Sequence, residues 1–131
     1  GNIGKCPMEF LDKLAASCLV ILELSSFQLQ DLKKSPRYAI ILNTTADHLD
    51  YHVDRDEYLR AKEQMLAWQG EDSVAVLNKD YEYSKYYKTL VNGDLKWVSA
   101  KYQVASKGGG VIKNGAYVKD GGIYYVKKGK S

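Results

Sequence analysis

The stretch CLVILELSSFQL, residues 18–29, decides how the chain is interpreted, because an apolar run turns abruptly polar within it. Residues 18–24 are too short and too apolar for an amphipathic helix, which predicts a buried strand of a parallel sheet. Glu23, Ser25 and Ser26 follow where a simple turn would carry Gly, Pro, Asn or Asp. Burying a carboxylate without a cation or hydrogen bonds is costly, so we expect this strand to deliver polar groups to a functional site.

On both sides of this stretch, the sequence predicts further strands and helices in alternation. Residues 38–43 (YAIILN) and 73–78 (SVAVLN) predict two more buried strands, and a helix is expected after Cys6-Pro7. Asp54 and Glu57 have the spacing of a capping box, so a helix of about four turns is predicted over RDEYLRAKEQMLAWQ. Residues 1–92 therefore predict an α/β domain with a mostly parallel sheet and flanking helices.

The pattern changes at about residue 93, where short strand-like runs and turn residues take over. Lys113-Asn114-Gly115 and Asp120-Gly121-Gly122 stand where hairpin turns are expected. We therefore predict a small antiparallel β meander over 93–131, formed by the runs LKWVSA, GVIK, AYVKD and GIYYVKK.

Composition restricts the function classes. With 131 residues, 45% hydrophobic and 27% charged, the chain is typical of one modest globular domain. No apolar run approaches the roughly 20 residues of a membrane helix. The two cysteines lack metal-site spacing and predict reduced thiols in the cytoplasm.

The lysines near the C-terminal end allow a second function class. They alternate with Gly, Val and Tyr, which favours the solvated face of strands. A non-catalytic module that binds nucleic acid through this basic meander stays an alternative, with Tyr102, Tyr117, Tyr124 and Tyr125 available to stack on bases. These tyrosines are expected instead to fill the inner face of the strands.

Polar residues follow all three predicted buried strands. Glu23 with Ser25 follows the first, Asn43 the second, and Asn78 with Asp80 the third. Ligands of open α/β sheets bind beyond the carboxyl ends of the strands, so these residues are candidates for a site. For Asn78 and Asp80 the ordinary turn and capping role is favoured.

Two further groups suit a metal site. Asp47 and His48 lie in the loop ADHLDYH, which holds both histidines, and such side chains can bind a divalent cation. From spacing alone, an exposed loop with capping aspartates and incidental histidines is the favoured explanation. Tyr58 and Lys62 share one face of the following helix, where a lysine is usually solvated.

Five motifs together resemble one family. GNIG, ELSSFQL, ILNTTADHLDYH, YLRAK and VLNKD, in this order and at these gaps, are similar to the central domain of the Mur ligases, the ATP-dependent enzymes that build the peptidoglycan stem peptide. ELSSFQL resembles the branch that adds D-glutamate to UDP-N-acetylmuramoyl-L-alanine. Another Mur ligase, or a ligase of the folylpolyglutamate type, is the alternative within this fold.

The resemblance implies both a chemistry and a set of residues. ATP phosphorylates the substrate carboxylate, and the amine of D-glutamate attacks the acyl phosphate to give an amide. The resemblance implies two Mg²⁺ ions, with Glu23 and His48 as ligands, and a Lys62 carbamylated by CO₂ that also reaches the metal. Asn2 and Ser25 resemble residues that contact the muramoyl-alanine substrate, and Asp47 is expected to shape the loop that carries His48.

The resemblance also implies that more protein is needed for activity. The family's phosphate-binding loop, its N-terminal UDP-binding domain and its C-terminal domain have no counterpart in these 131 residues. We therefore expect a partial central domain that is inactive by itself, belongs to a cytoplasmic ligase, and self-associates through exposed strand edges.

Overall fold

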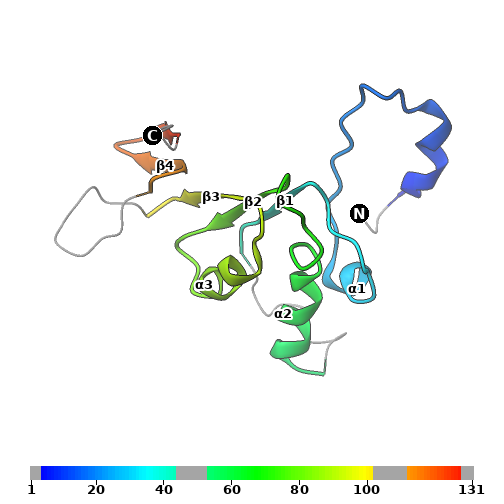
Figure 1. The fold of residues 1–131 in the computed structure, drawn as a ribbon, viewed down its shortest axis with the longest axis horizontal. Coiled ribbons are helices and arrows are strands. Elements are labelled where there is room, and N and C mark those ends of the chain that lie inside the picture. Colours follow the sequence, from blue (N-terminus) through cyan, green and yellow to red (C-terminus); the bar gives the residue numbers. More distant parts are fainter. Residues whose placement is uncertain (1–3, 44–52, 102–111, 128–131) are drawn as a thin grey trace.

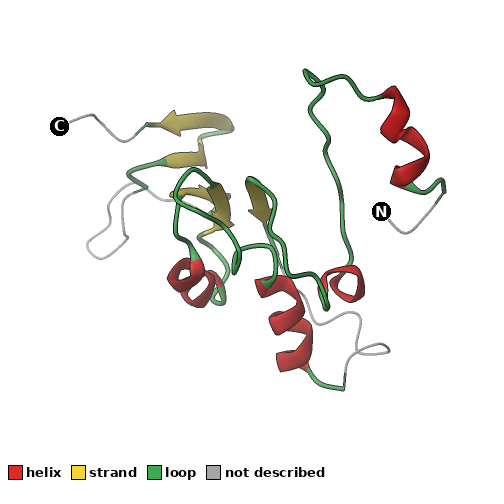
Figure 2. Ribbon diagram, turned by 45° about the vertical axis from the view of Figure 1, so that its right-hand side comes forward, coloured by secondary structure: helices red, strands yellow, loops and turns green. Residues whose placement is uncertain are grey.

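The computed structural model describes residues 4–43, 53–101 and 112–127, and the following statements concern these residues. Five strands form one sheet in the order β1-β2-β3-β4-β5. Figure 1 and Figure 2 show the helices α1, α2 and α3 together on one side of this sheet. The elements are η1 (Pro7–Lys13), α1 (Ser26–Leu29), β1 (Tyr38–Ile41), α2 (Arg55–Glu63), β2 (Val74–Asn78), α3 (Ser84–Tyr87), η2 (Lys88–Leu90), β3 (Asp94–Ser99), β4 (Gly115–Lys119) and β5 (Gly122–Val126).

The sheet is parallel from β1 to β4, and only β4 and β5 pair antiparallel. The predicted fold class, a mostly parallel α/β sheet with an antiparallel end, is confirmed. The predicted meander is smaller than expected, because LKWVSA forms β3 and extends the parallel sheet beside β2. One sheet thus combines strands from both sides of the predicted boundary between residues 92 and 93.

The core lies between the sheet and the helices on that one side. Alternate residues of β1 and β2 point into it, and buried side chains from α2, α3 and the turn after α2 cover them. The buried core residues are Ala39, Ile41, Tyr58, Leu59, Leu66, Ala75, Leu77 and Tyr87. On the other face of β1, Tyr38 and Ile40 are 58% and 59% exposed. The predicted strand over residues 38–43 is thus present as β1, but within the described residues it is buried on one face only, because the helices α1 to α3 lie on one side.

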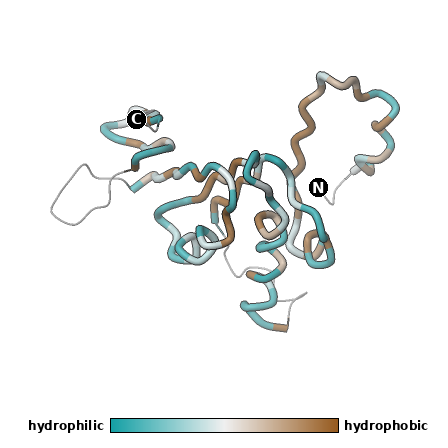
Figure 3. The backbone as a smooth tube through the Cα atoms, viewed as in Figure 1, coloured by the Kyte–Doolittle hydropathy of each residue, from teal (hydrophilic) through white to brown (hydrophobic). Residues whose placement is uncertain are grey.

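The apolar stretch before α1 is not a strand in this structure. Residues 18–24 run as an extended connection, and Leu19 and Ile21 are 76% and 85% exposed. Figure 3 shows this hydrophobic segment rising away from the sheet toward η1. The predicted buried strand is wrong here because no described strand pairs with the segment. Since β1 pairs with β2 alone among the described strands, its other edge also lacks a strand partner.

Two local predictions about α2 have different outcomes. Its N-terminus is capped as expected, because the Glu57 amide donates to Asp54 Oδ1 at 2.7 Å. Its C-terminus comes earlier than predicted. The Ser35 hydroxyl donates to the Gln64 carbonyl at 2.7 Å and accepts from the Trp68 amide at 2.9 Å, so it replaces the helical bond between those two groups.

The two predicted hairpin turns also differ. Asp120 and Gly121 join β4 to β5 with φ of 49° and 75°, as a two-residue hairpin turn requires. Asn114, in contrast, precedes a strand that is parallel to β3, so it is not in a hairpin turn. Its side-chain amide donates to Asp94 Oδ1 at 2.8 Å and to the Leu95 carbonyl at 2.9 Å.

The hairpin tyrosines are less buried than predicted. Tyr117 and Tyr124 stack on each other with their ring centroids 5.4 Å apart, and both Tyr124 and Tyr125 are exposed. They do not fill an inner face because the described helices do not cover this end of the sheet (Figure 1). None of the described helices is long and apolar enough to cross a membrane.

Candidate functional site

The carboxyl ends of β1, β2 and β3 meet at one edge of the sheet, as parallel pairing requires. There the Asn78 side-chain amide donates to Asn43 Oδ1 at 2.7 Å. The candidate residue Asn43 is exposed at this edge and is held by its neighbour. The sheet therefore presents a polar edge at the point predicted from the strand ends.

Asp80 has the structural role that was favoured for it. Its carboxylate accepts hydrogen bonds from the Ser99 hydroxyl and from the amides of Ala100 and Lys101, the latter two at 2.7 and 3.0 Å. Burial alone would raise the pKa of Asp80, but these hydrogen bonds hold it below its ordinary value. The charged side chain fastens the end of β3 to the end of β2.

Lys62 and the polar end of the ELSS stretch lie together. The Lys62 ammonium donates to the Leu24 carbonyl at 3.3 Å, although 38 positions separate the two residues. Burial lowers the pKa of Lys62, and the negative charge of Glu23 opposes this shift. Lys62 also lies 5.9 Å from the centre of the Tyr58 ring. The helix thus holds a half-buried amine beside an exposed carboxylate.

Ser25 is the N-cap of α1 and is half-buried. Its amide donates to Gln28 Oε1 at 3.0 Å, and the Gln28 amide donates back to the Ser25 carbonyl at 3.1 Å. This local bonding explains why SSFQ turns into a short helix directly after the extended segment. Ser25 directly follows Leu24, whose carbonyl accepts the hydrogen bond from Lys62, so the Ser25–Gln28 bonds hold Ser25 next to this contact.

Three other candidates, Asn2, Asp47 and His48, lie outside the described residues. Among the candidates that the structure describes, it brings Glu23 and Lys62 together. Within residues 4–43, 53–101 and 112–127, no three His, Cys, Asp or Glu side chains converge as metal ligands. The described pair is therefore one carboxylate, Glu23, and one amine, Lys62.

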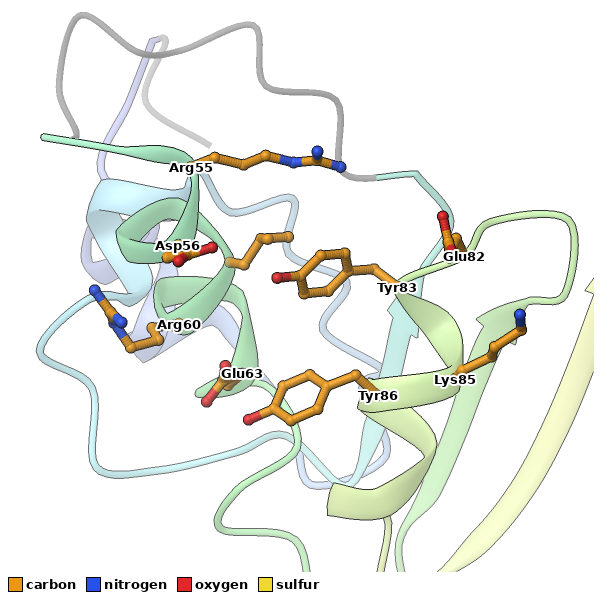
Figure 4. Close-up of a pocket in the computed structure, with 9 residues that line it drawn as sticks. Arg55, Asp56, Arg60, Glu63, Glu82, Tyr83, Lys85 and Tyr86 are labelled. Atoms are coloured by element: carbon orange, nitrogen blue, oxygen red, sulfur yellow. The ribbon is translucent and has the colours of Figure 1, made fainter.

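A cleft between α2 and α3 was not predicted from the sequence. It has a volume of about 640 Å³ and is lined by Arg55, Asp56, Leu59, Arg60, Glu63, Glu82, Tyr83, Lys85 and Tyr86. Figure 4 shows the Tyr83 and Tyr86 rings extending from α3 toward α2. The Arg55 guanidinium lies 5.7 Å from the centre of the Tyr83 ring.

The cleft has a balanced charge and differs in place from the Lys62 site. Three basic and three acidic side chains line it, and none of the described candidate residues does. Burial raises the pKa of Tyr86, and the charge and hydrogen bond of Glu63 raise it further. No local pattern could reveal this cleft, because its two walls come from helices that meet only in the folded chain.

Comparison with known proteins gives a family match over most of the chain. The family described as Mur ligase middle domain matches residues 5–127. Among curated proteins, the chain is 34% identical over 128 residues to the UDP-N-acetylmuramoylalanine–D-glutamate ligase of Clostridium botulinum, which covers 98% of this chain and 26% of that protein.

Two further relatives carry the same name. That of Clostridium acetobutylicum is 35% identical over 126 residues, 95% of this chain and 26% of the relative. That of Ruminiclostridium cellulolyticum is 36% identical over 118 residues, 90% of this chain and 25% of the relative. The chain therefore spans about a quarter of the length of these relatives.

Proposed function

Because this chain belongs to the Mur ligase middle-domain family, we propose that it forms part of an ATP-dependent ligase that joins D-glutamate to UDP-N-acetylmuramoyl-L-alanine. The names of the three relatives support this choice of substrates. The observation that carries the proposal is the half-buried Lys62, whose pKa burial lowers and whose ammonium contacts the backbone beside Glu23.

The proposed reaction forms an amide in two steps. The carboxylate of the muramoyl-alanine substrate takes the terminal phosphoryl group of ATP, and ADP leaves. The amine of D-glutamate then attacks the acyl phosphate carbon, phosphate leaves, and the amine loses a proton. Two Mg²⁺ ions would neutralise the negative charge of the phosphoryl oxygens in this site.

Lys62 would act as a carbamate. Its neutral amine adds to CO₂ and loses a proton, which turns a cation into an anion that can help hold Mg²⁺ together with Glu23. Only the neutral amine can react, and a lowered pKa increases its fraction at a given pH. The half-buried position of Lys62 on α2 thus favours the modification that the proposal requires.

The remaining candidates receive supporting roles in the proposal. Ser25, next to the Lys62 contact, and Asn2 would bind the muramoyl-alanine substrate. His48 would hold the second Mg²⁺, and Asp47 would shape its loop. Asn43 would lie at the polar edge of the sheet, where it already contacts Asn78.

The test is phosphate release by this chain within the complete reading frame that contains it. ATP, Mg²⁺, UDP-N-acetylmuramoyl-L-alanine and D-glutamate are supplied, and the wild type is compared with Lys62→Ala. Arg60→Ala is the matched control, since it also removes a cation from α2 but from an exposed position.

The proposal expects phosphate release that depends on D-glutamate, falls in Lys62→Ala and persists in Arg60→Ala. A short-chain carboxylate added to Lys62→Ala should restore part of the rate, because it can occupy the place of the carbamate. If no amino acid supports phosphate release by the wild type, the proposed ligase function is wrong.

We propose that the protein is cytoplasmic. We also propose that the 131-residue chain self-associates. The exposed Leu19 and Ile21 and the edge of β1 support self-association. Light scattering over a range of concentrations tests it, and a mass that stays that of one chain would contradict it.

A second candidate function rests on the β4–β5 hairpin. Tyr124 and Tyr125 are exposed there, with Lys119 and Lys127 nearby in sequence, so the hairpin could stack on the bases of single-stranded nucleic acid. Salt-dependent binding of a single-stranded oligonucleotide that Tyr125→Ala weakens would favour this function. No binding at low salt would exclude it.

A further inference from the structure

The carboxylate of Glu57 joins two segments that are distant in the sequence. Its Oε2 accepts a hydrogen bond from the Val53 amide at 2.7 Å. Its Oε1 accepts another from the Gln30 side-chain amide at 3.0 Å, across 27 positions. Capping of α2 explains the first bond, since Val53 and Asp54 come directly before the helix. It does not explain the bond to Gln30.

Gln30 caps the C-terminal end of α1, and the residues before the start of α1 carry the Lys62 contact. The segment from Leu24 to Gln30 is therefore tied to α2 at both ends. Leu24 pairs with Lys62 and Gln30 pairs with Glu57, so the segment runs antiparallel to α2. A four-residue helix cannot hold its own position, since isolated helices of this length are unstable.

We propose that Glu57 and Gln30 form a clamp that positions Glu23 relative to Lys62, and that Glu57 is a positioning residue of the site. The same carboxylate also holds the backbone amide of Val53, which lies directly before the N-cap of α2. One side chain thus ties the start of α2 to the segment that carries the Lys62 contact. The catalytic importance of this clamp rests on the proposed ligase function.

The Gln30 variants isolate the clamp, because they leave the cap of α2 intact. Gln30→Leu has a similar size but no donor, and Gln30→Lys restores a donor that faces Glu57. Glu57→Gln keeps only one acceptor oxygen for two donors. Asp56→Asn is the matched control, because Asp56 is the other acidic residue in the first turn of α2 and contributes equally to the helix dipole.

The first readout is amide hydrogen exchange of residues 24–30 in the complete reading frame. Exchange should be faster in Gln30→Leu and Glu57→Gln, and unchanged in Gln30→Lys and Asp56→Asn. The second readout is phosphate release. In Gln30→Leu we expect kcat to fall on the order of tenfold, below the hundredfold that a 1 Å misplacement can cost, with KM for ATP little changed. Gln30→Lys should retain the wild-type kcat.

Exchange that stays at the wild-type rate in Gln30→Leu would overturn the clamp. Faster exchange with an unchanged kcat would overturn its positioning role. The exchange readout needs no turnover, so it decides the clamp even when the wild type releases no phosphate. A wild type that releases no phosphate would refute the proposed ligase function and, with it, the clamp's part in catalysis.

Discussion

Replacing Asp80 with alanine should detach the end of β3 from the end of β2 and lower the free energy of unfolding. Asp80 lies two residues after β2, and its two carboxylate oxygens accept hydrogen bonds from three consecutive residues, Ser99, Ala100 and Lys101. The change therefore tests whether the polar edge of the sheet is held by a single charge.

The expected magnitude follows from the exposure of each donor. A hydrogen bond to a charged group contributes about 1.5–3 kcal/mol. The amides of Ala100 and Lys101 belong to exposed residues and can bind water instead, whereas Ser99 is buried and would lose its acceptor. We therefore expect Asp80→Ala to lower the free energy of unfolding by about 2–3 kcal/mol and Ser99→Ala by about 1 kcal/mol.

The assay is urea unfolding followed by tryptophan fluorescence, which reports on both tryptophans, Trp97 in β3 and Trp68 after α2. A lower midpoint at an unchanged slope measures the loss of stability. Asp72→Ala is the control, since Asp72 is an exposed aspartate just before β2, and its removal should change the free energy by less than about 0.5 kcal/mol.

The pH dependence of stability gives a second check with a definite sign. The pKa of Asp80 is lower in the folded chain than its ordinary value of 3.8. Its carboxylate therefore stabilises the fold above pH 3.8, and this contribution is lost as the pH falls through the lower pKa of the folded state. The difference in stability between the wild type and Asp80→Asn should shrink in that range.

Two results would refute this reasoning. One is a midpoint for Asp80→Ala no lower than that for Asp72→Ala. The other is strict additivity of Asp80→Ala and Ser99→Ala in the double variant, because two side chains that share a hydrogen bond must show a coupling energy.

Three further predictions concern stability and use the same urea assay. Leu77→Ala should lower the free energy of unfolding by about 2–5 kcal/mol, because Leu77 is fully buried in β2. Ile123 is 82% exposed, so Ile123→Ala should lower it by less than about 0.5 kcal/mol. Similar losses for the two variants would contradict the one-sided core. Gly121→Val should cost about 1–2 kcal/mol because φ is 75° there, and a neutral result would contradict the turn. Asn114→Ala removes three hydrogen bonds to β3 and should cost about 1–2 kcal/mol. Amide exchange in β4 as slow as in the wild type would count against this role.

Features that depend on residues a few positions apart could be predicted from the sequence. The Asp54–Glu57 spacing predicted the cap of α2, the short apolar runs predicted β1 and β2, and Asp120-Gly121 predicted the hairpin turn. These predictions hold because capping, strand formation and turn geometry depend strongly on local backbone sterics and hydrogen bonds. The five ordered motifs also indicated the family, which the match over residues 5–127 confirms.

Which elements meet is set by tertiary contacts. These place β3 parallel to β2, end α2 where Ser35 replaces a helical hydrogen bond, and bring Gln30 to Glu57. Among the described strands, none pairs with the apolar residues 18–24. An apolar pattern shows that a segment can be buried, but not what will bury it. That choice depends on contacts between residues far apart in the sequence, and each such contact must offset the entropy of closing the loop between them.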